Sequence, residues 1–137
     1  LLKIIEEGLF LMKTIKIPTN KEKFYRQILE VLKSFPTFTS LRPKELDVLG
    51  QFMKYNEIHS NLDIYSRGAL FSSTPFKKML REEIDMSEDS FNNNLSRLRK
   101  LKLISSNNTL HKFIDDIKYS NGYEIKFIFK LNESIGK

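Results

Sequence analysis

The sequence of 137 residues contains neither cysteine nor tryptophan. The lack of cysteine excludes disulfide bonds, thiolate chemistry and cysteine-bound metal clusters. Its longest apolar runs are far shorter than a membrane-spanning helix requires, so we expect no contact with a membrane. Residues 1–11 are interrupted by Glu6 and Glu7 and precede no small-residue cleavage site, which is unlike an export signal. The sequence therefore favours a cytoplasmic protein.

Catalytic motifs are also scarce. His59 and His111 are the only histidines, and each stands among polar neighbours, which is typical of a solvated or capping histidine. Asp115 and Asp116 are adjacent, so on a strand they would face opposite sides and share no substrate or metal ion. The sequence has no glycine-rich phosphate loop, and its serines and threonines have no histidine at a recognisable spacing. We therefore expect a protein that is not an enzyme and binds no cofactor or metal ion.

What remains is the composition of one globular domain with a basic surface. The formal net charge is +6 and the pI is about 9.5, which weakly favours polyanionic partners. The chain has 17 Lys, 14 Ile and 10 Asn but only 6 Arg. This bias indicates AT-rich coding, such as that of a phage or a low-GC bacterium.

Residues 80–104 have the clearest apolar pattern in the chain. Leu80 and Ile84 are four residues apart, and a second apolar row follows at intervals of three or four: Phe91, Leu95, Leu98 and Leu101. These spacings predict two helices, each with one buried face. Ser87 lies between them and is a good N-cap residue, because its hydroxyl can accept a hydrogen bond from the first turn.

This stretch resembles the helix-turn-helix of the winged-helix family. In that family a first helix ends in L-A-x-x-L-G-x-S, a recognition helix follows, and G-L-I leads into a β-hairpin called the wing. The matching residues are the apolar pair Leu80 and Ile84, the cap Ser87, the buried Phe91 and Leu95, and Leu103-Ile104 before the wing.

The chain departs from the family pattern at three positions. Arg81 stands where the family has a small alanine between the two helices. Asp85 replaces the glycine that takes a left-handed turn, although aspartate tolerates that geometry better than most residues. Lys102 replaces the glycine that precedes the wing.

The resemblance implies an α+β fold that is mostly helical: a winged helix-turn-helix with an extra N-terminal helix and a C-terminal β-hairpin wing. We expect an N-terminal extension with a short strand (1–18), one winged-helix domain (19–131) and a tail (132–137). Within the domain, the helix-turn-helix spans 75–101 and the wing spans 102–131. The expected helices lie near residues 20–34, 43–55, 75–84 and 87–101.

The strands of the expected wing meet at Asn121-Gly122, a strong signal for a type I′ hairpin turn. Residues 123–131 alternate well, and we expect a strand at 114–119 to pair with them. Residues 110–117 also fit a helical turn. A short strand at 68–72 could pair with the wing.

Charge is divided unevenly along the expected recognition helix. Residues 85–96 carry Asp85, Glu88 and Asp89 and no base, which gives −3. Residues 97–112 carry no acid and a charge of +5 from Arg97, Arg99, Lys100, Lys102 and Lys112. The acidic half lies where a recognition helix normally meets DNA, and phosphates repel carboxylates there.

On the DNA-binding interpretation, this is a regulator of transcription whose helix 87–101 enters the major groove of double-stranded DNA. Asparagine can pair with adenine and arginine with guanine, whereas Lys102, Lys112 and Arg99 would contact phosphates. The full set of expected DNA contacts is Ser87, Ser90, Asn92, Asn93, Ser96, Arg97, Arg99, Lys100, Lys102 and Lys112. The asparagines also fit a solvated helix face in an AT-rich gene.

A second interpretation is a winged helix used for protein contact, in a phage particle or a replication assembly. The acidic charges, Arg81 and the modest net charge favour it. Residues 21–35 carry an apolar stripe that fits either a partner or homo-oligomer surface or an ordinary core helix.

Overall fold

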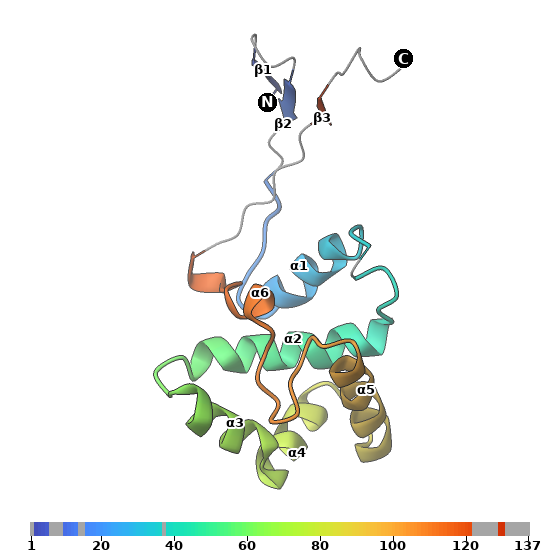
Figure 1. The fold of residues 1–137 in the computed structure, drawn as a ribbon, viewed down its shortest axis with the longest axis vertical. Helices are drawn as coiled ribbons and strands as arrows, with labels where there is room; N and C mark the ends of the chain where they lie inside the picture. Colours follow the sequence, from blue (N-terminus) through green and yellow to red (C-terminus); the bar gives the residue numbers. More distant parts are fainter. Residues whose placement is uncertain (1, 6–9, 14–15, 37, 122–128, 131–137) are drawn as a thin grey trace. The chain divides into compact units, whose positions relative to one another are not determined.

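The computed structural model describes residues 2–5, 10–13, 16–36, 38–121 and 129–130. The chain divides into two compact units (Figure 1). One comprises the two chain ends, Leu1–Pro18 and Tyr123–Lys137, and the other comprises Thr19–Gly122.

The unit made from the chain ends contains a small antiparallel sheet. Strand β1 (Leu2–Ile5) pairs with β2 (Phe10–Lys13), and β2 pairs with β3 (Phe129–Lys130). Phe10 lies opposite Lys130 in the second pair. The N-terminal extension, in which we expected one short strand, therefore holds two.

The larger unit is helical in its described part (Figure 1). The long helix α2 (Pro43–Ile58) packs against α1 (Phe24–Leu32), α4 (Thr74–Glu83), α5 (Glu88–Lys100) and the short α6 (Lys112–Asp115). Helix α3 (Ile64–Ser72) packs against α4, and a 3-10 turn, Tyr119–Asn121, follows α6. The helices α1, α2, α4 and α5 match the four that the sequence predicts.

The apolar stripe of α1 belongs to the core. Tyr25 and Leu29 are buried, and a Cβ atom placed on Gly50 of α2 would lie 3.9 Å from Leu29 Cδ1. The stripe is thus used inside the unit, which agrees with the core-helix interpretation of residues 21–35.

The winged-helix fold class is wrong for this chain. Residues 114–119, expected as a wing strand, instead run from the end of α6 through a turn at 116–118 to the start of the 3-10 turn. Ile114 and Ile117, three residues apart, are both buried, which alternation along a strand would not allow. Strand β3, which lies in the segment expected to pair with them, pairs with β2. Residues 122–128 and 131, which include the predicted Gly122 turn, lie outside the described residues.

The expected strand at 68–72 is also wrong, because these residues lie in α3. The Asp63 side chain accepts a hydrogen bond from Ser66 N at 2.8 Å and so caps this helix. Two of its residues are buried, Gly68 and Phe71, whereas Tyr65 is 83% exposed. Its apolar residues therefore do not share one face, and periodicity could not reveal the helix.

Candidate nucleic-acid interface

The candidate interface is built on α4 and α5, which meet in a tight turn. Asp85 has φ 53°, as expected for the residue that replaces the family's glycine. Its N–H donates to Glu82 O at 3.1 Å, and Met86 N donates to Arg81 O at 2.8 Å. This pair of bonds is a Schellman motif, which ends α4 and satisfies its last carbonyls. Arg81 is partly exposed, and α4 still packs against α5.

Helix α5 ends in the same motif. Lys102 has φ 65°, and its N–H donates to Arg99 O at 3.0 Å. Leu103 N donates to Leu98 O at 3.1 Å. A lysine thus takes the left-handed conformation at the second position where the family has glycine, at a cost of about 1–2 kcal/mol.

The start and the buried face of α5 agree with the sequence prediction. Ser90 N donates to Ser87 Oγ at 3.2 Å, so Ser87 is the N-cap. Phe91, Leu95 and Leu98 are 1%, 2% and 0% exposed, respectively. They fix the rotation of the helix against α2 and so determine which side chains face outward.

The two arginines of α5 already have partners within the chain. Arg97 Nε lies 3.5 Å from Glu45 Oε2, and Glu45 is a buried residue whose carboxylate also accepts from Arg42 N at 2.9 Å. Arg99 donates from Nε and Nη2 to Asn108 Oδ1, at 3.2 Å from Nε. Two hydrogen bonds therefore orient the Arg99 guanidinium, whereas Arg97 makes only the ion pair, and its buried Nε has no hydrogen-bond partner among the described residues.

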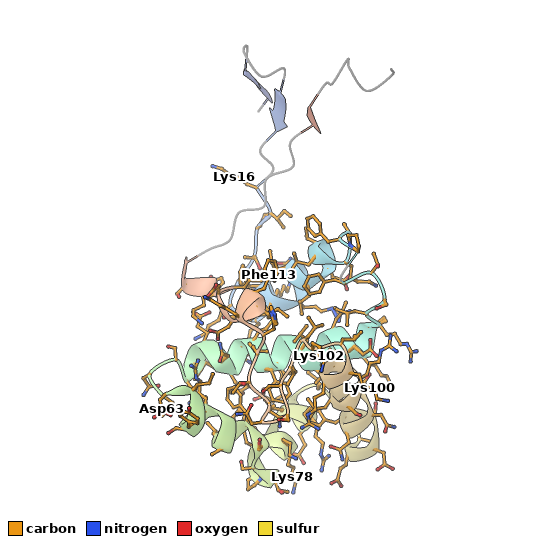
Figure 2. The ribbon with its side chains drawn as sticks, in the orientation of Figure 1. Lys16, Asp63, Lys78, Lys100, Lys102 and Phe113 are labelled. Atoms are coloured by element: carbon orange, nitrogen blue, oxygen red, sulfur yellow. The ribbon has the colours of Figure 1, made fainter. Side chains whose placement is uncertain are left out.

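The other expected contacts differ in how free they are. Ser87 is used as the cap, and Ser90 accepts from Asn94 Nδ2 through both its carbonyl and its hydroxyl. Four of the expected contacts on α5 are exposed and their side chains make no hydrogen bond or ion pair with another described residue: Asn92, Asn93, Ser96 and Lys100. Lys100 and Lys102 lie near the same end of α5 (Figure 2). Lys112 is exposed in α6.

The sequence did not reveal the role of Asn108. This residue is buried, has φ 65° and donates from Nδ2 to Phe71 O at 3.0 Å while accepting from Arg99. It thereby fixes the 105–109 loop between α3 and α5. Asparagine is enriched in left-handed turns, so Asn107-Asn108 was a turn signal, but its helix partners lie far away in sequence.

The 105–109 loop and the end of α5 enclose a shallow hollow. Its volume is about 480 Å³. Six of the eight residues that line it carry basic or hydroxyl side chains: Arg99, Lys102, Ser105, Ser106, Thr109 and His111. The other two, Ile104 and Leu110, are apolar. None of the described residues that line it is acidic.

Helix α4 is held on α2 by Glu83. Its carboxylate accepts from Tyr55 Oη at 2.6 Å and from Gln51 Nε2 at 3.0 Å. Burial opposes ionisation, but these hydrogen bonds and the nearby Lys54 ammonium outweigh it and lower the pKa of Glu83. Burial, together with the Glu83 carboxylate, raises the pKa of Tyr55 to about 12. The pair therefore remains an ionised acceptor and a protonated donor at neutral pH.

The described residues hold no cluster of three or more histidine, cysteine or acidic side chains with metal-ligand geometry. Across the same residues, every helix is too short or too polar to cross a membrane. Comparison with protein-family models, curated proteins and solved structures gave no match to this sequence. A functional assignment therefore rests on the geometry of the chain itself.

Proposed function

We propose that the protein binds double-stranded DNA through the outward face of α5, as a cytoplasmic regulator of transcription. The observation that carries this proposal is the row of unpartnered side chains on that face. Asn92, Ser96 and Lys100 follow one another at intervals of four residues, and Asn93 lies beside them. Residues four apart are neighbours on a helix surface.

The chemistry of this row suits base edges. An asparagine amide can donate to and accept from adenine at N6 and N7, and a helix of ordinary diameter fits the major groove. Rigid support adds to this, because α5 is capped at Ser87 and packed on α2. Side chains on a fixed helix lose little further conformational freedom when they bind.

Charge along the helix gives the proposed complex an orientation. Glu88 and Asp89 are exposed in the first turn of α5, whereas Lys100 ends the helix and Lys102 follows it. Phosphates repel the first pair and attract the second. The C-terminal half of α5 therefore lies nearer the DNA backbone, and affinity for random DNA is modest.

The test is a titration of fluorescent duplex DNA at several salt concentrations. We expect a slope of log K against log salt of about 0.9 per neutralised phosphate, which reports only a few contacts. Lys100→Ala weakens binding and flattens the slope. Lys21→Ala, an equal change of charge before α1, is the matched control and leaves binding unchanged. No salt-sensitive association with any duplex at low ionic strength would refute the proposal.

A protein-binding function is the second candidate, as a module of a phage particle or a replication assembly. The exposed Ile64 and Tyr65 at the start of α3 favour it, because they form an apolar surface beside the acidic Asp63. If Tyr65→Ser abolishes function in the cell while Lys100→Ala has no effect, this candidate replaces DNA binding.

A further inference from the structure

The hollow between the end of α5 and the 105–109 loop has a composition that suits an anion. Its lining brings together an arginine, a lysine, a histidine and three hydroxyl groups. We propose that this hollow is a phosphate-binding site. The identity of the ligand rests on the proposed function: if the protein binds DNA, the phosphate is a phosphodiester of the DNA backbone. Free inorganic phosphate offers the same chemistry.

Four donors at the hollow remain for a ligand. Lys102 Nζ, Ser106 Oγ and Arg99 Nη1 make no hydrogen bond with another described residue. His111 accepts the Phe113 N–H on Nδ1 at 3.1 Å, so a neutral His111 carries its proton on Nε2 and can donate from there. A phosphodiester offers acceptor oxygens and no donor of its own, and all four of these groups can donate to it.

The walls of the hollow are held in place before any ligand binds. Ser105 N donates to Thr109 O at 2.8 Å, and His111 N donates to Leu103 O at 2.9 Å. On the other side, Ser72 Oγ donates to Asn107 O at 3.2 Å. A Cβ atom on Gly68 would lie 3.0 Å from Asn107 Nδ2, so the loop packs closely on α3. A preformed site loses less conformational entropy on binding.

The helix end does not repel the anion as an open one would. Free carbonyls at a helix C-terminus carry partial negative charge. Here the carbonyls of Leu98 and Arg99 accept from Leu103 and Lys102 in the Schellman motif. The backbone strain at Lys102 points the same way, because strained conformations of non-glycine residues concentrate at functional sites. The need for a positive charge at the site would explain why a lysine stands at position 102, where glycine would avoid the strain.

The experiment follows the amide resonances of Ser106 and Asn107 in the full chain during titration with inorganic phosphate, with chloride keeping ionic strength constant. A second arm uses duplex DNA. The principal variant is Lys102→Gly, which removes the ammonium and relieves the left-handed strain, so misfolding does not explain a loss of binding. His111→Asn removes the Nε2 donor while keeping an acceptor for the Phe113 N–H. Lys21→Ala is the matched control, because this exposed lysine does not line the hollow.

We expect saturable shifts of both amides with phosphate, and about tenfold weaker binding in Lys102→Gly, the loss of one charge-assisted hydrogen bond. Lys21→Ala binds phosphate like the parent protein. Shifts with phosphate ion but no association with any duplex would retain the site and refute the DNA proposal. Shifts with duplex alone, weakened in Lys102→Gly, would identify the phosphodiester as the ligand.

Two results overturn the inference. One is duplex binding that shifts α5 amides while the two loop amides stay fixed, which would leave the DNA proposal standing alone. The other is a Lys102→Gly protein that binds phosphate as tightly as the parent, which would show that the shifts report adventitious binding only.

Discussion

Asp85 and Lys102 occupy equivalent positions in two successive helices. Each is the residue with positive φ that follows a helix end, and each donates its N–H to the carbonyl three residues earlier. Glycine adopts this conformation without steric cost. Helices α4 and α5 are therefore both followed by a non-glycine residue in the left-handed conformation, in which the side chain causes steric strain.

Replacing either residue by glycine should stabilise the protein. We expect Asp85→Gly and Lys102→Gly each to raise the free energy of unfolding by about 1 kcal/mol, because the left-handed penalty of about 1–2 kcal/mol is partly offset by glycine's greater freedom in the unfolded chain. Urea denaturation measures this change. Ser96→Gly, at an exposed position inside α5, is the control and should destabilise the protein by about 0.5 kcal/mol or less. Destabilisation by both terminal substitutions would contradict the strain argument.

The buried face of α5 gives a second prediction. Leu95→Ala should cost roughly 2–5 kcal/mol, because it removes a fully packed side chain and leaves a cavity. Asn92→Ala, one turn earlier on the exposed face, should change stability little. Thermal unfolding of the two variants tests the rotation of the helix. Equal melting temperatures would show that Leu95 does not face the core.

Gly50 gives a third prediction. It lies inside α2, where glycine costs about 1 kcal/mol relative to alanine, and a Cβ atom there would meet its nearest neighbour at ordinary contact distance. Gly50→Ala should therefore stabilise the protein by about 0.5–1 kcal/mol in urea denaturation. A loss of stability would mean that α1 lies closer to α2 than the structure shows.

The loss of unfolding free energy at acid pH should depend on Glu57. Burial opposes ionisation of this carboxyl, but hydrogen bonds from Tyr25 Oη and from the N–H groups of Ser120 and Tyr119 outweigh it, so its pKa lies below the ordinary 4.5. A lowered folded-state pKa contributes stability above 4.5 that is lost as the pH falls through the folded value. Urea denaturation between pH 7 and 3 should show that the free energy of unfolding falls less steeply with pH in Glu57→Gln than in the parent protein. Glu82→Gln, an exposed glutamate, is the control and keeps the parent slope.

Removing the acidic charges of α5 should strengthen binding to random DNA. Glu88→Gln and Asp89→Asn together remove repulsion from phosphates while Ser87 still caps the helix. We expect tighter association with non-specific duplex and a smaller difference at high salt, where repulsion is screened. Fluorescence anisotropy at two salt concentrations measures both. Unchanged affinity would place the first turn of α5 away from the DNA.

Local chemistry is what the sequence could predict. Ser87 caps α5 because its hydroxyl meets its own first turn, and Phe91, Leu95 and Leu98 are buried because their spacing follows one helix face. Such features depend on residues within a few positions of each other.

The rest depends on partners that are distant in sequence. Glu45 forms an ion pair with Arg97, and the Phe71 carbonyl accepts a hydrogen bond from the Asn108 side chain. No local sequence pattern connects the two residues of either pair. The expected strand at 114–119 was wrong because a short apolar segment fits both periods, and burial of Ile114 and Ile117 selected the helical one.

The pairing of β2 with β3 sets an order of events during synthesis. Residues 14–128 separate these strands in the chain. The complete helical unit, Thr19–Gly122, therefore leaves the ribosome before the segment that contains β3 is available. Until β3 is synthesised, β1 and β2 can form only a two-stranded hairpin, which is marginally stable at best in water. Strand β3 is thus translated after the helical unit, although it completes the sheet that β1 and β2 begin.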